Sequence, residues 1–268
     1  MEENKYFENI ATYKLLAKHE VGQNFLIDKD VAKRIVDLAD IKDDDNVLEI
    51  GSGAGSLSFY ILQHSAHSTL IDIDEGLITK LINDFADKEN AKILVKNAMK
   101  FDYKGYTKIV SNLPYYITSG ILKSVLIDAT QCKKAVFMVQ SEAYDRLFSK
   151  VGTKEYSPLG ILLEYRTKKT ATFKVSRNAF VPAPHIDSTV FALEFNQTDN
   201  DVDLKEFYDL LSALFLNRRK TIENNLSRAV GSKEKATSIL KAINIDPKAR
   251  PEQIKLNDYL KIYREARR

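Results

Sequence analysis

The sequence has very little of several features that define whole classes of protein. Its single cysteine, Cys132, excludes an internal disulfide and any zinc site built from several cysteines. Tryptophan is absent, and 10 glycines and 6 prolines in 268 residues are too few for a collagen-like or low-complexity chain. No apolar run approaches the roughly 18 residues of a membrane span, and the charged N-terminus lacks the apolar core of a secretory signal. We therefore expect a cytoplasmic protein that uses neither a membrane nor a metal.

Basic residues are concentrated in two places, although the formal net charge is only +3. Residues 165–186 contain no Asp or Glu, and a second basic cluster, NRRK, occupies residues 217–220. The side chains that we expect to contact the phosphates of a nucleic acid are Lys168, Lys169, Lys174, Arg177, Arg218, Arg219 and Lys220. Such clusters are typical of phosphate contact, and solvated strand and helix ends are the alternative.

Hydrophobic periodicity divides the chain into two parts. Short β-branched runs alternate with segments of helical period, the runs being residues 46–50, 68–73, 91–95, 108–111 and 135–139. This alternation predicts an α/β, Rossmann-like domain with a mostly parallel sheet, and the runs at 170–175 and 188–195 predict an antiparallel hairpin at its edge. Past a polar linker only the helical period remains. We predict a first domain over residues 1–198 and a small all-α C-terminal domain over residues 199–268.

A glycine-rich turn follows the first of these strands. Gly51, Gly53 and Gly55 lie where the strand passes into a helix, and small residues there let the backbone approach a ligand. Asp72 lies about twenty residues later, at a strand end, where a carboxylate can bind ribose hydroxyls; Asp74 is a competing candidate. The pattern indicates an adenosine-containing cofactor, and by itself does not separate a nicotinamide dehydrogenase from an S-adenosylmethionine enzyme.

The fourth strand ends in NLPYY, at the sheet edge where the cofactor is expected. An aromatic amine is a poor nucleophile because its lone pair is delocalised, so a methyltransferase must hold it between fixed acceptors. The Asn112 side-chain oxygen and the Leu113 carbonyl, whose direction Pro114 restricts, can accept its two hydrogens. Tyr115 offers a ring for base stacking. The sequence therefore predicts methylation of adenine N6 by positioning rather than by a general base, with a purely structural turn as the alternative.

Six motifs resemble, in order and spacing, those of the rRNA adenine N6-dimethyltransferases. The resemblance is strongest to the bacterial small-subunit branch associated with kasugamycin sensitivity, which is related to the erythromycin-resistance rRNA methylases. The motifs are GQNFLID (22–28), LEIGSGAG (48–55), NLPYYITS (112–119), MVQSEAYDRL (138–147), FVPAPHIDSTV (180–190) and FLNRRKTIENNL (215–226). They extend over nearly the whole chain.

The resemblance implies a cofactor, a substrate and a set of site residues. S-adenosyl-L-methionine would be bound by Asn24, Leu26, Gly51, Gly53, Asp72, Asn97 and Asn112. Catalysis would rest on Asn112, Leu113, Pro114 and Tyr115, with Tyr115 and Phe180 enclosing the flipped adenine. A monomer would methylate each of two adjacent adenosines twice, in the 3′-terminal hairpin of small-subunit (16S) rRNA, during late subunit assembly. The C-terminal domain would bind RNA.

The chain also departs from the family pattern. Asn97 stands where Asp is usual, so we expect weaker cofactor binding, because a charged acceptor forms a stronger hydrogen bond than a neutral amide oxygen. Asp72 stands where Glu is usual and is one methylene shorter. His185 replaces a usual Lys near the expected RNA surface. Two alternatives stay open: a large-subunit (23S) rRNA adenine methyltransferase of the macrolide-resistance type, and a non-enzymatic RNA-binding assembly factor.

Overall fold

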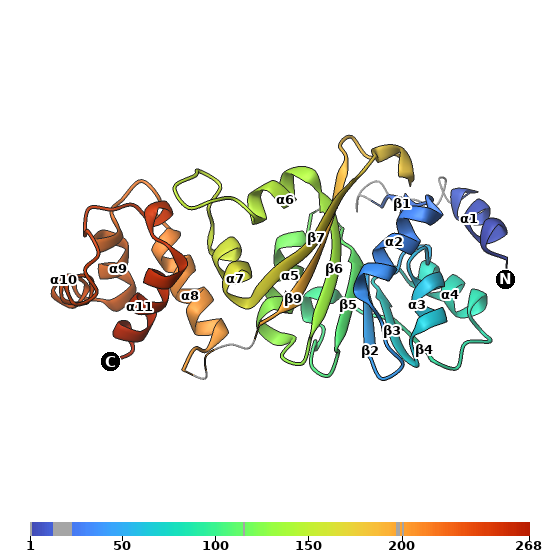
Figure 1. Cartoon of the computed structure of the whole chain (residues 1–268), viewed down its shortest axis with the longest axis horizontal. Helices are drawn as coiled ribbons and strands as arrows, with labels where there is room; N and C mark the ends of the chain where they lie inside the picture. The colour runs from blue at the N-terminus through green and yellow to red at the C-terminus, as the bar shows by residue number, and fades with distance from the viewer. Residues whose placement is uncertain (1, 13–22, 115, 197–198, 200) are drawn as a thin grey trace. The chain divides into compact units, whose positions relative to one another are not determined.

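The computed structural model describes residues 2–12, 23–114, 116–196, 199 and 201–268. The chain forms two compact units (Figure 1). The first, here called the sheet unit, contains Met1–Ala143 and Lys168–Phe195, and the second, the helical unit, contains Tyr144–Thr167 and Asn196–Arg268. The segment 144–167 therefore groups with the helical unit, whereas the sequence assigned it to the first domain. Whether either division matches independently folding domains stays a prediction.

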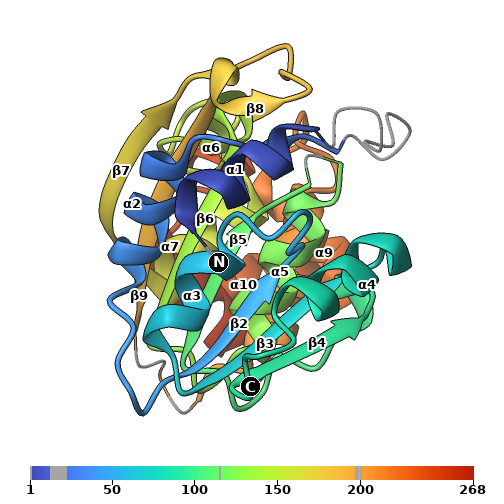
Figure 2. The same cartoon turned by 90° about the vertical axis from the view of Figure 1, so that its right-hand side faces the viewer.

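The sheet unit is built on a sheet whose described strands have the order β4-β3-β2-β5-β6-β9-β7 (Figures 1 and 2). The strands are β2 (Asn46–Ile50), β3 (His67–Asp72), β4 (Ala91–Val95), β5 (Lys108–Asn112), β6 (Lys134–Gln140), β7 (Thr167–Val175) and β9 (Ser188–Phe195). Strands β2 to β6 pair in parallel, and β9 pairs with β6 antiparallel. The predicted mostly parallel sheet is confirmed, with β9 and then β7 at the end of the sheet beyond β6.

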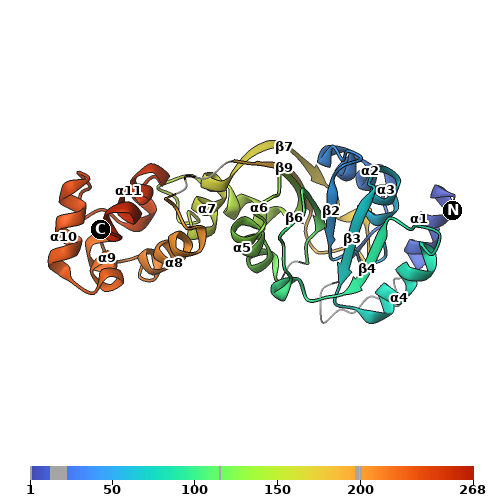
Figure 3. The same cartoon turned by 90° about the horizontal axis from the view of Figure 1, so that it is seen from below.

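Helices cover both faces of this sheet, with α2, α3 and α4 on one side and α5 on the other (Figure 3). Their bounds are α2 (Lys29–Ala39), α3 (Ser58–His64), α4 (Glu75–Asp84) and α5 (Thr118–Asp128). Two of them begin at aspartate caps: Asp28 accepts from Val31 N at the start of α2, and Asp74 accepts from Gly76 N at the start of α4. A capping carboxylate satisfies backbone donors that have no partner within the helix, which explains these starting points.

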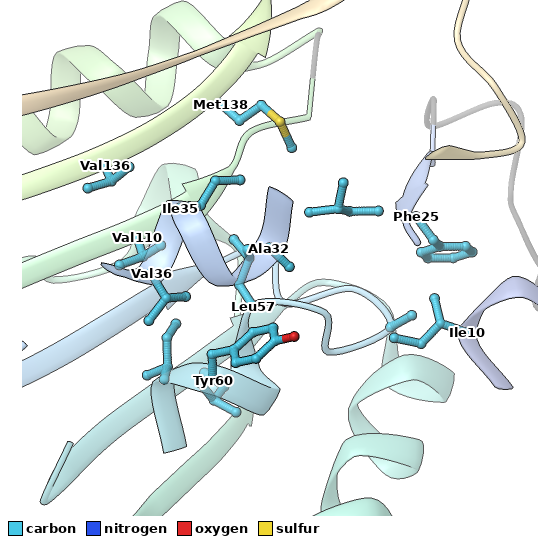
Figure 4. Close-up of a cluster of buried hydrophobic side chains, with 14 of the residues drawn as sticks. Ile10, Phe25, Ala32, Ile35, Val36, Leu57, Tyr60, Val110, Val136 and Met138 are labelled. Atoms are coloured by element: carbon cyan, nitrogen blue, oxygen red, sulfur yellow. The ribbon is translucent and has the colours of Figure 1, made fainter. Parts of the chain in front are cut away.

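The core of the sheet unit combines the sheet with elements that lie outside it (Figure 4). Val110 and Val136 from neighbouring strands are fully buried together with Ile35 of α2. Strands covered on both faces read as continuous apolar runs, which is why the sequence revealed them. Ile10 and Phe25 join the same cluster from α1 (Glu3–Ala11) and β1 (Phe25–Leu26), two elements that the periodicity did not predict.

A small second sheet joins two distant parts of the chain. Strand β1 pairs antiparallel with β8 (Phe180–Val181), which follows the short helix η4 (Arg177–Ala179), so that Leu26 lies opposite Phe180. The predicted hairpin of residues 170–175 and 188–195 leaves residues 176–187 as its connecting loop, without a strand. Strands of two residues are too short to show an alternation of apolar and polar residues, and β1 and β8 are far apart in the sequence. Hydrophobic periodicity therefore could not predict them.

The helical unit contains α7 (Pro158–Arg166), α8 (Leu204–Phe215), α9 (Ile222–Val230), α10 (Lys233–Ala242), η5 (Pro251–Gln253) and α11 (Leu256–Ala266), with most of α6 (Ser141–Leu147) (Figure 3). The predicted all-α C-terminal part is confirmed. A break at residues 216–221 separates α8 from α9, where Thr221 caps α9 by accepting from Asn224 N. Among the described residues, no helix combines the length and apolarity needed to traverse a bilayer.

Candidate cofactor and methyl-transfer site

One cavity of the sheet unit lies at the carboxyl ends of β2, β3 and β5. Four stretches contribute to it: residues 23–26 at β1, the turn at 51–54, residues 72–73 after β3, and residues 112–114 after β5. In open α/β sheets this edge is where ligands bind, because the strand ends and the helix starts leave a crevice there. The cavity therefore brings together most of the residues that the sequence nominated for cofactor binding and catalysis.

The glycine-rich turn has a backbone held at both ends. Gly51 N and Ser52 N both donate to the Ile71 carbonyl, at 2.8 and 3.1 Å, and Gly55 N donates to the Ser52 carbonyl at 2.9 Å. Gly51 and Gly53 have φ values of +70° and +53°, a region that side chains disfavour. The turn thus presents main chain, rather than side chains, to the cavity.

Of the two candidate aspartates, Asp72 lines the cavity, whereas Asp74 is not part of its described wall. Its carboxylate accepts from Gly53 N and from Asp74 N, both at 2.9 Å, so it is fixed beside the turn. Burial raises the pKa of Asp72 above its ordinary value, and hydrogen bonds from backbone donors, among them those of Asp74 and Gly53, oppose this rise. Asp74 instead caps α4 and accepts from Gln23 Nε2 at 3.3 Å. The structure therefore leaves Asp72 as the candidate for ribose recognition.

Glu49 is a cavity residue that the motif reading did not nominate. It is 1% exposed, and its carboxyl accepts a hydrogen bond from Ser58 Oγ at 2.6 Å. Burial raises the pKa of Glu49 to about 8, so the side chain is mostly neutral at pH 7. A charged residue inside the otherwise apolar run VLEI, residues 47–50, is the sequence signal that could have identified it.

Ser52 provides a test of whether the cavity suits a polar ligand. It lines the cavity, is 4% exposed, and its hydroxyl has no hydrogen-bond partner among the residues that the structure describes. Buried hydroxyls are nearly always paired, because an unpaired one carries a desolvation cost. An orphaned hydroxyl in the wall of a cavity therefore fits a cofactor with polar groups.

The residues nominated for catalysis lie directly across from the glycine turn. Asn112 ends β5, and Leu113 N donates to the Met138 carbonyl at 3.0 Å, which fixes the start of the segment. The Pro114 ring lies 3.7 Å from the place where a Cβ on Gly51 would be. Tyr115 lies outside the described residues. Tyr116 lines the cavity and is 60% exposed, so an aromatic ring is available at its rim.

Two nominated residues lie elsewhere in this structure. Asn97 is exposed, is not part of the described cavity wall, and caps the short helix η3 (Ala98–Lys100) by accepting from Met99 N at 2.9 Å. Phe180 is 2% exposed in the core, where it pairs with Leu26 across β1 and β8. Leu26 does line the cavity, so Phe180 is paired with a cavity residue without being part of the described cavity wall. Contact of Asn97 with the cofactor and of Phe180 with the target base stay predictions.

The basic residues nominated for RNA contact differ in how exposed their side chains are. In the sheet unit, Lys168, Lys169, Lys174 and Arg177 are exposed on β7 and η4. In the helical unit, Arg219 and Lys220 are exposed, whereas Arg218 is half-buried and donates to the Tyr156 carbonyl at 2.6 Å. Arg218 therefore has a structural partner within its own unit.

Three features define the class of protein: the mostly parallel sheet with helices on both faces, the glycine turn with Asp72, and the Asn-Leu-Pro segment at a strand end. They are those of a Rossmann-like domain of the S-adenosylmethionine-dependent methyltransferases. A family model described as ribosomal RNA adenine dimethylase matches residues 15–268. The chain belongs to the ribosomal RNA adenine dimethylase family, whose cofactor is S-adenosyl-L-methionine.

Individual relatives agree with this assignment. The chain is 37% identical over 266 residues to a ribosomal RNA small subunit methyltransferase A from Malacoplasma penetrans, covering 97% of this chain and 96% of the relative. It is 34% identical to the protein of that name from Pediococcus pentosaceus, covering 95% and 91%. A dimethyladenosine transferase from Plasmodium falciparum superposes with a TM-score of 0.77 at 25% identity, covering 88% of this chain and 94% of that one. The 23S rRNA methyltransferase ErmE shares the fold, with a TM-score of 0.66 at 21% identity over 91% of this chain and all of that one.

Proposed function

We propose that this protein transfers methyl groups from S-adenosyl-L-methionine to adenine N6 in small-subunit rRNA. Each of two adjacent adenosines in the 3′-terminal hairpin receives two methyl groups, late in assembly of the subunit and in the cytoplasm. The observation that supports this most directly is the placement of Asn112, Gly51 and Asp72 in one cavity wall, at the carboxyl edge of the sheet. Relatives named small subunit methyltransferase A support the choice of the small subunit.

The cavity residues have separate roles in this proposal. The main chain of residues 51–53, the Asp72 carboxylate and the Ser52 hydroxyl bind the cofactor, which supplies an electrophilic methyl group. Asn112 and the Leu113 carbonyl hold the two N6 hydrogens and so direct the nitrogen lone pair toward that methyl group. This positioning is the main catalytic contribution of the chain, because an oriented pair of reactants avoids most of the entropic barrier.

The proposed RNA contact in the helical unit is a basic surface at the start of α9, which we call the α9 surface. Ile222 N donates to the Ala249 carbonyl at 2.7 Å, and this hydrogen bond joins the loop before η5 to the start of α9. The α9 surface consists of Arg219, Lys220, Lys248 and Arg250, all exposed. None of these four forms an ion pair with another described residue, so their charge is available to phosphates.

The basic residues of α11 differ from the α9 surface. Arg264 pairs with Asp199 at 2.7 Å and with Asp201 at 2.8 Å, and Arg267 pairs with Glu206 at 3.2 Å. These contacts within the helical unit neutralise the arginines of α11. The number of basic residues does not distinguish the two regions. The α9 surface is favoured as the RNA contact because its basic residues have no ion-pair partner among the described residues.

The experiment that tests the proposal is methyl transfer from labelled S-adenosylmethionine to immature small ribosomal subunits that lack the modification. Large subunits serve as a parallel substrate, and the product nucleosides are identified. We expect dimethyladenosine in small-subunit RNA alone. Label in large-subunit RNA would overturn the choice of substrate, and RNA binding without label in either subunit would overturn the enzymatic role.

A further inference from the structure

The N-terminal helix α1 lies before residue 15, where the match to the family model begins, and packs against the sheet unit. Its Tyr6, Phe7 and Ile10 are buried, and Figure 4 shows Ile10 beside the core cluster. The Tyr6 ring stacks on Phe59 of α3, with ring centroids 5.0 Å apart, and lies 5.7 Å from the Phe85 ring. Helix α1 is therefore an integral part of the structure around the glycine turn.

One carbonyl of that turn accepts hydrogen bonds from two different helices. Tyr6 Oη of α1 donates to the Ala54 carbonyl at 3.1 Å, and Lys80 Nζ of α4 donates to the same oxygen at 3.2 Å. The Lys80 ammonium also lies 5.1 Å from the centre of the Tyr6 ring, within range of a cation–π interaction. Because Ala54 lines the cavity, these donors set the orientation of a peptide group in the cavity wall.

The next residue shows how closely the turn fits α1. Gly55 has a φ of +92°, and a Cβ on it would lie 2.2 Å from the Tyr6 hydroxyl oxygen and 2.6 Å from Leu81 Cδ2. Only glycine avoids both the disfavoured backbone conformation and this overlap. The space beside the turn is therefore already filled by the hydroxyl of Tyr6.

We propose that Tyr6 is a positioning residue for cofactor binding: together with Lys80 it holds the Ala54 peptide, and thereby the turn 51–54, in the conformation that receives the cofactor. The inference rests on the proposed function, in which this cavity binds S-adenosylmethionine. A turn that is ordered before binding loses little conformational entropy when the cofactor arrives, so removing an anchor weakens affinity without touching the ligand.

The hydroxyl of Tyr60 supplies a matched control. It donates to Glu3 Oε1 at 2.6 Å, so it also anchors α1, in this case to α3, and among the described residues it has no hydrogen bond to the glycine turn. If Tyr6 serves only to anchor α1, then loss of either hydroxyl has the same consequences. If Tyr6 positions the turn, only its own loss changes cofactor affinity.

The test compares the full-length wild type with Tyr6→Phe and Tyr60→Phe. Calorimetry gives the Kd for S-adenosylmethionine, kinetics give kcat and both KM values, and thermal unfolding gives Tm. For Tyr6→Phe we expect a Kd and a cofactor KM about three- to tenfold higher, the change in affinity that corresponds to one lost hydrogen bond. The KM for RNA, and kcat at saturating cofactor, stay unchanged. Tyr60→Phe lowers Tm without changing the Kd.

Other outcomes separate the inference from the proposed function. An unchanged Kd in Tyr6→Phe, or an equal rise in Tyr60→Phe, would overturn the positioning role. A wild type that does not bind S-adenosylmethionine would overturn the proposed function itself.

Lys80→Met gives a second, independent measurement, since it removes the other donor to Ala54 and should raise the Kd in the same direction. Its control is Lys33→Met, which removes an i, i+4 ion pair of the same type, to Asp37, on α2. Equal Kd values for these two variants would count against the shared role of Tyr6 and Lys80.

Discussion

The sheet unit and the helical unit present their polar groups in opposite ways. In the sheet unit, Glu49 and Asp72 are removed from solvent to different degrees and are held by hydrogen bonds of known direction. In the helical unit, the side chains of the α9 surface are exposed and have no ion-pair partner among the described residues. A buried group acts through geometry and pKa, whereas an exposed charge acts through a field that salt screens. Salt and pH therefore distinguish the contributions of the two units.

Asn112→Ala should have the largest effect, and it should be confined to chemistry. Loss of one oriented polar group in an active site lowers kcat by about 10²- to 10³-fold in other enzymes, and we expect a similar loss of methyl transfer here. RNA affinity should stay the same, because the exposed cations are intact. The measurement is single-turnover methylation beside filter binding of RNA. Asn112→Asp, which keeps an acceptor, should retain more activity than Asn112→Ala, and full activity in Asn112→Ala would refute the positioning mechanism.

Glu49→Gln should change how stability depends on pH. The pKa of Glu49 is about 8 in the folded protein against an ordinary 4.5, so folding favours the neutral form. The contribution of Glu49 to the free energy of unfolding is fully present below pH 4.5 and is lost as the pH rises through 8. Its total is on the order of a few kcal/mol. The variant stays neutral and should not show this loss.

Denaturant unfolding of the wild type and Glu49→Gln between pH 5 and pH 9, a range set by the shifted pKa, measures this effect. The exposed Glu8 of α1 offers the control Glu8→Gln, which should follow the wild type. Parallel curves for all three proteins would show that Glu49 is charged in the folded state.

Removal of charge from the α9 surface should change affinity in a salt-dependent way. We expect Arg219→Ala with Lys220→Ala, or Lys248→Ala with Arg250→Ala, to weaken RNA binding. The slope of log K against log salt should become shallower by about one for each phosphate that the variant no longer neutralises.

The matched control for the α9 surface is Lys233→Ala with Lys241→Ala, two exposed lysines on α10. If this pair lowers the slope as much as the α9 variants do, RNA binding is not localised at the α9 surface. Arg218→Ala should instead lower Tm, because Arg218 bonds to the Tyr156 carbonyl.

Ser52→Ala should have the smallest effect. It should not lower the stability of the free protein, and it should weaken the binding of the cofactor. The substitution removes a buried hydroxyl that lacks a partner, so the Tm of the free protein should stay level or rise, while cofactor Kd should increase about threefold. Ser68 of β3 provides the control, since its hydroxyl is equally orphaned among the described residues and lies outside the described cavity wall. Ser68→Ala should match the Tm change and leave the Kd as it is; a Kd shift in both variants would remove Ser52 from the cofactor site.

Strands were the most predictable elements. Residues 46–50 and 91–95 match β2 and β4 without any shift, because strands inside a covered sheet need continuous apolar runs. The glycine turn and Asp72 were predictable for a similar reason, since both are set by local backbone requirements. Helix α1 and the pairing of β1 with β8 were not predicted, because their stability comes from contacts with segments far away in the sequence.

The site residues also differ in how far the sequence could predict their positions. Residue type and spacing nominated Asn112 and Asp72, and both line the cavity. Spacing could not show that Asn97 caps η3, that Phe180 is buried, or that Arg218 bonds a carbonyl while Arg219 is exposed. Nor could it show that Ser52 lacks a partner among the described residues. These properties depend on which groups from other elements happen to lie within hydrogen-bonding or packing distance.

The sequence by itself determined the α/β class, the helical C-terminal part and the cofactor motif, because hydrophobic periodicity and glycine conformations are properties of neighbouring residues. Only the tertiary structure decided that Tyr6 and Lys80 share the Ala54 carbonyl, and that the α9 surface keeps its charge while the arginines of α11 are paired. Burial and pairing are decided by elements brought together from distant positions, and the free energy of each polar group depends on those neighbours.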